Sequence, residues 1–211
     1  MGKIRARTNE ELAARKEEII TAAQKLLMKE DYNSITLATI AENTSICRTS
    51  MYTYYETKES VFVDLMIKEY QDIEKELLNN LTMQMDRRTF CKWLTDLLWN
   101  HQTLLKLLSL QLSVYDHRYG DDQIEHFVKA TSPYMKAMDQ VLQFHFPHAS
   151  DKAKNIFKIQ YSVYCNSLYA IQHLPQSQMA AMEKQDVFAS IPDSKQICFD
   201  GLMLLSTVLE V

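Results

Sequence analysis

Residues 35–62 constrain the fold more than any other part of this chain. Their apolar side chains are spaced as two short helices joined by a tight turn and followed by the start of a longer helix. Thr36 is a suitable N-cap for the first helix. The inner face of that helix would carry Leu37, Ile40 and Ala41. The pattern therefore predicts a helix-turn-helix unit.

The second helix of this unit, expected over about residues 47–54, has two faces of different character. Met51 and Tyr55 lie four residues apart, hence on one face, which is expected to pack into the core. The opposite face carries three polar side chains: Arg48, Thr49 and Tyr52. An arginine can bind guanine with two hydrogen bonds, whereas hydroxyls suit base or phosphate contacts. This face is therefore predicted to bind DNA.

Other polar side chains nearby would fix the unit on the phosphate backbone. Lys58 stands at the start of the longer helix, where it is expected to clamp a phosphate. The complete set of predicted DNA-contacting residues is Thr36, Arg48, Thr49, Ser50, Tyr52, Tyr54 and Lys58. For Arg48, contact with a base edge is the preferred interpretation and contact with a phosphate is the alternative.

The motifs of this region resemble those of TetR/AcrR-type transcriptional regulators. The matching segments are Ile35-Thr36, Ile40-Ala41, residues 46–55 and Lys58-Glu59, together with the packing stripe Ile19, Ala22-Ala23 and Leu26-Leu27. The resemblance covers about residues 10–65. Three features depart from the family pattern. Ser45 and Asp31 stand where glycines are usual, in the turn and before Tyr32. Cys47 replaces the usual serine cap of the recognition helix, and Ala38 stands where some relatives carry a base-contacting arginine.

The resemblance implies a homodimeric regulator, by family habit a repressor, that a small molecule releases from a pseudo-palindromic operator. It implies no enzymatic activity. The first domain would cover residues 1–60, and the second, residues 61–211, would bind the effector and form the dimer. A helix-turn-helix-shaped protein-interaction module without specific DNA binding remains the alternative, and a small helical enzyme would leave residues 35–62 unexplained.

Composition supports an all-α fold in a cytoplasmic protein. The 211 residues are 46% hydrophobic, with only three glycines and four prolines. The four cysteines show no CxxC spacing, which favours a reducing cytoplasm. Neither a signal peptide nor a membrane-spanning run is expected.

The charge excludes a nonspecific DNA binder. The chain carries a net charge of −4, and residues 1–60 hold nine Lys and Arg against nine Asp and Glu. The N-terminal arm is basic through Lys3, Arg5 and Arg7. It would follow the phosphate backbone or enter the minor groove, or else be a solvated tail.

The second domain is predicted to be entirely helical. A long helix would begin near Val61, and Asp86 would cap another. A polar loop around Gly120 would precede a short helix over residues 122–130, after which Ser132-Pro133 would open a new helix.

The last two helices, residues 151–174 and 193–210, are strongly apolar. The final one is apolar on two sides, which predicts a homodimer through these two helices. Burial within a monomer is the alternative.

Aromatic residues dominate the predicted effector pocket. The candidates are Phe90, Trp93, Trp99, His101, Tyr115, Phe127, Tyr134, Met138, Phe144, Tyr161 and Tyr164. Plain core packing is the alternative for each of them. Such a lining would suit an apolar or aromatic effector.

His145 and His148 have metal-like spacing, but Pro147 interrupts the helix, so no metal is expected. The glycine-poor chain offers no phosphate loop, and no cofactor is expected.

Overall fold

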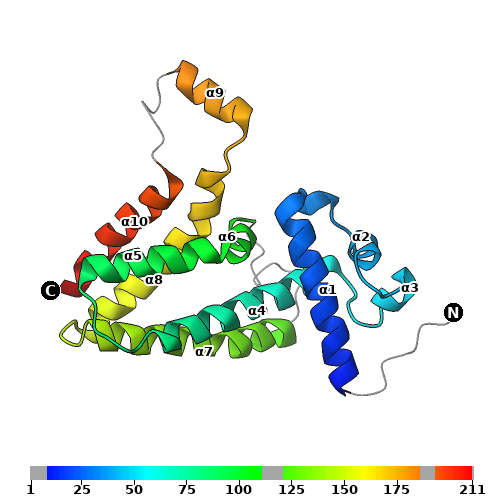
Figure 1. Ribbon diagram of the computed structural model, residues 1–211, viewed down its shortest axis with the longest axis horizontal. Helices are drawn as coiled ribbons and strands as arrows, with labels where there is room; N and C mark the ends of the chain where they lie inside the picture. The colour runs from blue at the N-terminus through cyan, green and yellow to red at the C-terminus, as the bar shows by residue number, and fades with distance from the viewer. Residues whose placement is uncertain (1–8, 111–120, 186–192, 211) are drawn as a thin grey trace. The chain divides into compact units, whose positions relative to one another are not determined.

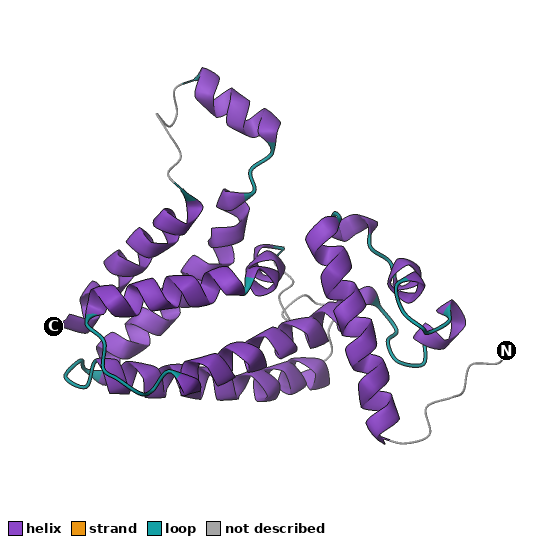
Figure 2. Ribbon diagram, in the orientation of Figure 1, coloured by secondary structure: helices purple, strands orange, loops and turns teal. Residues whose placement is uncertain are grey.

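The computed structural model describes residues 9–110, 121–185 and 193–210. Every regular element in these ranges is a helix, which confirms the predicted all-α fold class (Figure 2). The chain divides into two compact units, residues 1–69 and 70–211. The division falls within α4, Lys58–Asn79, whereas the sequence places the domain boundary after residue 60, near the start of the same helix. The arm residues Lys3, Arg5 and Arg7 lie outside the described residues.

Three α-helices, with the 3-10 helix Tyr32–Ser34 between the first two, build the first unit before α4 begins (Figure 1). They are α1 (Asn9–Lys29), α2 (Leu37–Glu42) and α3 (Arg48–Met51). The predicted packing stripe of α1 is buried, including Ile19 and Leu27 at 0% exposure. Met51 and Tyr55 are buried too, as the four-residue spacing predicts. These side chains form the small core on which the helix-turn-helix depends.

The second unit is a bundle in which α8 is central. Its further helices are α5 (Arg87–Asn100), α6 (Gln102–Ser109), α7 (Asp121–His145), α8 (Asp151–Gln172), α9 (Gln176–Lys184) and α10 (Ser194–Leu205). A short 3-10 segment, Ser206–Glu210, follows α10. Helix α8 packs against α6 and α10, and α10 also packs against α5. Asp86 caps α5 as predicted, because its carboxylate accepts a hydrogen bond from the Thr89 N–H.

Helix α7 corrects the predicted break at Ser132-Pro133. The structure has one continuous helix from Asp121 to His145, with Pro133 inside it. A proline within a helix has no N–H to give to the carbonyl four residues earlier, here that of Lys129. Ser132 Oγ donates to this Lys129 oxygen at 3.1 Å. The hydroxyl beside the proline therefore satisfies the acceptor that the proline leaves open, and the helix continues.

The two predicted terminal helices are present as α8 and α10, but a further helix separates them. Helix α9 was not predicted, and it buries none of its residues. In Figure 1 it stands apart from the bundle, between the ends of α8 and α10. Helices α8 and α10 approach closely at Gly201, where an added Cβ would lie 2.1 Å from Tyr164 Oη. Of the described helices, none is both long and apolar enough to span a membrane.

Candidate nucleic-acid interface and effector cavity

The first helix of the helix-turn-helix begins in a reciprocal pair of threonines. The Thr36 hydroxyl accepts from the Thr39 N–H at 3.2 Å, and the Thr39 hydroxyl accepts from the Thr36 N–H at 2.9 Å. This capping box satisfies donors that a helix start leaves open. Thr36 is thus the N-cap that the sequence predicts, and its side chain is held at the start of α2.

The recognition helix is shorter than predicted. Regular α-helix covers Arg48–Met51, not residues 47–54. The chain then continues in hydrogen-bonded turns, with the Tyr54 N–H bound to the Met51 carbonyl at 2.9 Å. Its N-cap, Cys47, makes no side-chain cap hydrogen bond, in agreement with the poor capping ability of cysteine. Instead, Cys47 Sγ lies 2.9 Å from Ser50 Oγ.

The polar face of α3 is exposed while its apolar face is buried. Met51 has 0% exposure, whereas Tyr52, its neighbour in the chain, is 59% exposed. Arg48 and Thr49 are exposed as well, and Ser50 and Tyr54 are half-buried. Among the described residues, none forms a hydrogen bond or ion pair with the Arg48 guanidinium. Its five N–H donors are therefore available to an external acceptor.

Lys58 is held at the first turn of α4. Its Nζ donates to the Tyr32 carbonyl oxygen at 2.8 Å and lies 4.2 Å from the centre of the Tyr32 ring. The Tyr32 ring itself packs on Phe62. An ammonium group has three protons, so this contact leaves Lys58 with donors for a phosphate.

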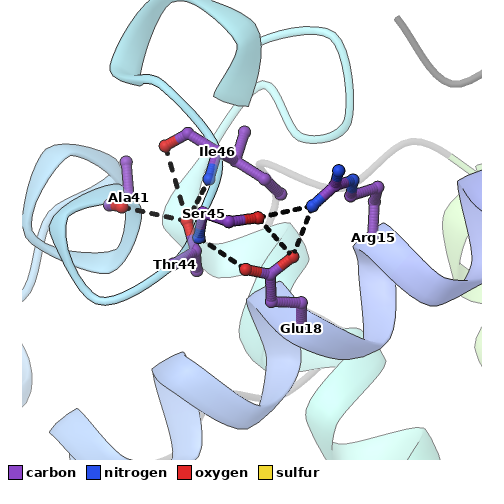
Figure 3. A network of polar contacts seen from close by, with 6 residues as sticks. All are labelled: Arg15, Glu18, Ala41, Thr44, Ser45 and Ile46. Atoms are coloured by element: carbon purple, nitrogen blue, oxygen red, sulfur yellow. Dashed lines mark hydrogen bonds and ion pairs between the residues drawn. The ribbon is translucent and has the colours of Figure 1, made fainter. Parts of the chain in front are cut away.

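A polar network fastens the turn between α2 and α3 to α1 (Figure 3). Glu18 accepts from the Ser45 N–H at 2.5 Å and from the Ser45 hydroxyl at 3.1 Å. Arg15 Nη1 donates to the same carboxylate at 2.9 Å. Within the turn, the Thr44 hydroxyl donates to the Ala41 carbonyl and accepts from the Ile46 N–H. The sequence pattern gave no sign of Glu18, because its partner lies 27 residues away.

These contacts set the protonation of Glu18. Partial burial acts to raise its pKa, but the hydrogen bonds from Ser45 and the guanidinium of Arg15 outweigh burial and hold the pKa below the ordinary 4.5. A carboxylate with a depressed folded-state pKa stabilises the fold above its unfolded-state pKa. That stabilisation is lost as the pH falls through the folded-state value.

Glu18→Gln is therefore expected to lower the free energy of unfolding by about 1 kcal/mol at neutral pH. The wild-type advantage should begin to shrink below about pH 4.5, where Glu18 of the unfolded chain takes up a proton, and it should be lost once the pH falls below the lowered pKa of the folded protein. Chemical denaturation across pH 3–7 measures it. Glu17→Gln, which removes a more exposed carboxylate paired with Lys68, is the control for loss of charge. An advantage that stays constant down to pH 3 would contradict the assigned role of Glu18.

A cavity of about 310 Å³ lies within the second unit. Its aromatic lining comes from three helices and consists of Tyr70, Phe127, Tyr134 and Tyr161. Its aliphatic lining consists of Leu98, Leu104, Leu108 and Met135. The remaining lining residues are polar but uncharged: Thr131, Ser162, Cys165 and Asn166. The volume is at the lower end of the range of about 300–1,000 Å³ that is usual for small-molecule sites.

The titratable groups of this cavity are neutral at physiological pH. Burial raises the pKa of Cys165 to about 12. Burial also raises the pKa values of Tyr70, Tyr134 and Tyr161 above the usual value for a phenol. No charged side chain is present among the described lining residues.

A wider open groove of about 870 Å³ lies between α7 and α8. Phe144 is among its lining residues, but most of the others are polar. Lys154 donates to Gln143 at 2.5 Å, and Lys158 pairs with Asp139. Because these polar groups are already paired and the groove is open to solvent, the aromatic cavity is the better candidate for an apolar effector.

Residues 66–207 match the family model described as "Tetracyclin repressor-like, C-terminal domain". This match spans more than half of the chain. The chain belongs to the TetR family of transcriptional regulators.

Solved TetR-family structures share the fold over nearly the whole chain. The fatty acid degradation regulator FadR from Bacillus halodurans is 13% identical, with a TM-score of 0.58 over 95% of this chain and 96% of that one. A putative TetR-family regulator from Mesorhizobium loti is 13% identical, with a TM-score of 0.59 over 96% and 98%. FadR from Thermus thermophilus, solved in complex with lauroyl-CoA, is 15% identical, with a TM-score of 0.56 over 90% and 93%. No curated protein matches the chain significantly.

Three of the predicted effector contacts line the cavity of this TetR-family chain: Phe127, Tyr134 and Tyr161. Tyr115 lies outside the described residues. Phe90, Trp93 and His145 form an aromatic cluster and are not among the lining residues of the cavity. Met138 is buried at 1% exposure and is not among the lining residues.

The other predicted contacts have partners elsewhere. Trp99 lies under the Lys195 ammonium, and His101 Nε2 lies 3.1 Å from Glu76. Tyr164 donates to the Ile197 carbonyl at 2.8 Å. Tyr70 lines the cavity but is not among the effector contacts predicted from the sequence. Its position in the apolar stripe of α4 predicted core packing only.

The His145–His148 pair does not assemble a metal site. His145 Nδ1 accepts from the Met85 N–H at 3.2 Å, and burial lowers the pKa of this histidine. Within the described part of the chain, no three His, Cys, Asp or Glu side chains come together as metal ligands.

Proposed function

We propose that this TetR-family chain is a sequence-specific transcriptional repressor that binds a pseudo-palindromic operator as a homodimer. A small, uncharged, apolar or aromatic effector would release it. The observation that carries the proposal is the division of α3 into a buried face at Met51 and an exposed face at Arg48, Thr49 and Tyr52. In this role Arg48 and Thr49 contact base edges, and Ser50, Tyr52, Tyr54, Thr36 and Lys58 hold the phosphate backbone.

The terminal helices support the homodimer. Helix α8 exposes Ile159 at 58% and Val163 at 65%, and α10 exposes Leu204 at 73%. Large apolar side chains on neighbouring helices are typical of a protein-protein interface. Two recognition helices about 34–36 Å apart would then bind the two half-sites of one operator.

The cavity supports the effector chemistry. A coenzyme A thioester, such as the lauroyl-CoA bound to Thermus thermophilus FadR, carries phosphates that need cationic partners. The uncharged lining of this cavity offers none among its described residues, so we propose a ligand of a different and smaller class.

Selection of bound sequences from a random duplex pool tests the proposal. The purified wild-type chain should enrich a pseudo-palindromic motif at moderate salt, and an Arg48→Ala Tyr52→Ala double variant should not. Equal folding of the two proteins, checked by circular dichroism, makes the comparison valid. Failure of the wild type to enrich any motif would favour a protein-interaction module with a helix-turn-helix shape.

A further inference from the structure

The Tyr70 hydroxyl is the unusual polar group of the cavity. Tyr70 lies on α4, and its ring packs at 4.9 Å from the ring of Tyr134 and at 6.3 Å from that of Phe127. Its hydroxyl forms no hydrogen bond with any of the described residues. It is also not one of the fully buried polar atoms that lack a partner, so it remains accessible. A phenol in an apolar cavity normally has a hydrogen-bond partner. This hydroxyl is therefore free to bind a group that enters the cavity.

Two further lining residues carry hydroxyls that already donate their protons. Thr131 Oγ1 donates to the Phe127 carbonyl, and Ser162 Oγ donates to the Lys158 carbonyl, both at 2.9 Å. A helical hydroxyl bound to its own backbone in this way keeps only acceptor lone pairs for other partners. Among the lining hydroxyls, those of Tyr134 and Tyr161 bond to each other, Thr131 and Ser162 can only accept, and Tyr70 can donate. The amide of Asn166 adds a group that can both donate and accept. A ligand hydroxyl, which both donates and accepts, would complement this set.

Size and charge narrow the ligand further. A volume of 310 Å³ corresponds to about ten water molecules at about 30 Å³ each, and hence to roughly ten non-hydrogen atoms. Binding of an anion would be unfavourable, because the ion would lose its hydration and meet no cation among the described lining residues. Four aromatic rings in the lining favour stacking or edge contacts with another ring.

We infer that the cavity binds an uncharged, monocyclic phenol and that the Tyr70 hydroxyl recognises the hydroxyl of this ligand. The inference rests on the proposed function and deepens it, because it names the ligand class and a specificity-determining residue. Tyr70 lies on α4, which begins at Lys58 and contains the division between the two units, so the ligand would contact the element that joins them.

A double-mutant cycle, in which one change is made in the full-length protein and the other in the ligand, tests the inference. The variant is Tyr70→Phe, and the probes are para-ethylphenol and ethylbenzene, which differ by one hydroxyl. Calorimetry should show that Tyr70→Phe weakens para-ethylphenol binding by about threefold to tenfold and leaves ethylbenzene binding unchanged. Para-ethylbenzoate should not bind to either protein. Tyr169→Phe, which removes a phenol outside the cavity lining, is the matched control.

Equal loss of affinity for both probes would overturn the role of the Tyr70 hydroxyl, because it would indicate altered packing. Absence of binding by para-ethylphenol, or binding of para-ethylbenzoate, would overturn the ligand class. The DNA selection described above is done without these probes. Its failure would contradict the proposed function while leaving the calorimetric result on the cavity interpretable.

Discussion

Arg48→Ala is expected to abolish preference for one base pair in each operator half-site. A bidentate arginine-guanine contact contributes about 1–3 kcal/mol of discrimination. The homodimer would carry two such contacts far enough apart to add, so operator affinity should fall by about 2–6 kcal/mol. Because Arg48 has no described partner in the free protein, its removal should leave the stability of the fold almost unchanged. Fluorescence anisotropy with the selected operator and its point variants measures both effects.

Arg48→Lys separates the base-edge interpretation from the phosphate alternative. Lysine keeps the positive charge but lacks the planar fork that binds guanine. With a base contact, Arg48→Lys should lose specificity almost as Arg48→Ala does. With a phosphate contact, it should retain most of the affinity, and Arg48→Ala would weaken all sequences alike. Lys29→Ala, which removes an exposed cation from the end of α1, is the control for net charge.

Gly201→Ala is expected to destabilise the second unit by about 1–3 kcal/mol. The new Cβ would lie 2.1 Å from Tyr164 Oη and 2.3 Å from its Cζ. Tyr164 would have to move, and its hydrogen bond to the Ile197 carbonyl would break. Overpacking of this kind usually costs about 1–3 kcal/mol, and a lost hydrogen bond adds about 1 kcal/mol. The better helix propensity of alanine returns about 1 kcal/mol.

In a Tyr164→Ala variant, Gly201→Ala is expected to stabilise the protein rather than destabilise it. Removal of the phenol removes the three atoms that lie nearest to the added methyl group, so the gain in helix propensity should dominate. Gly201→Ala should then stabilise the protein by up to about 1 kcal/mol. Thermal unfolding of the four proteins in this cycle gives the coupling between the two sites. Additive effects would mean that α8 and α10 do not depend on glycine for their close approach.

Local spacing predicted the first unit well because its determinants are close in sequence. Met51 and Tyr55 are four residues apart, and the Thr36 cap acts on Thr39. The anchoring of the turn could not be predicted, because Glu18 reaches Ser45 from a distant part of the chain. The length of α3 was overestimated because apolar spacing continues through turns as well as through a helix.

The second unit was harder to predict because partners there depend on helix packing. A proline usually marks a helix start, but the hydroxyl of Ser132 allows α7 to continue through Pro133. Helix α9 buries nothing and so left no apolar pattern to detect. Aromatic content alone did not distinguish Tyr161, which lines the cavity, from Phe90, which is completely buried in an aromatic cluster.

The contact between Lys58 and Tyr32 would lower the entropic cost of operator binding if Lys58 binds a phosphate as proposed. A lysine side chain that becomes ordered loses up to about 2 kcal/mol of rotamer freedom. Here the Tyr32 carbonyl and ring restrain the ammonium in the free protein. Most of that rotamer freedom is then lost when the domain folds, so little would remain to be lost on binding of a phosphate. A preorganised cation of this kind raises affinity without adding a contact.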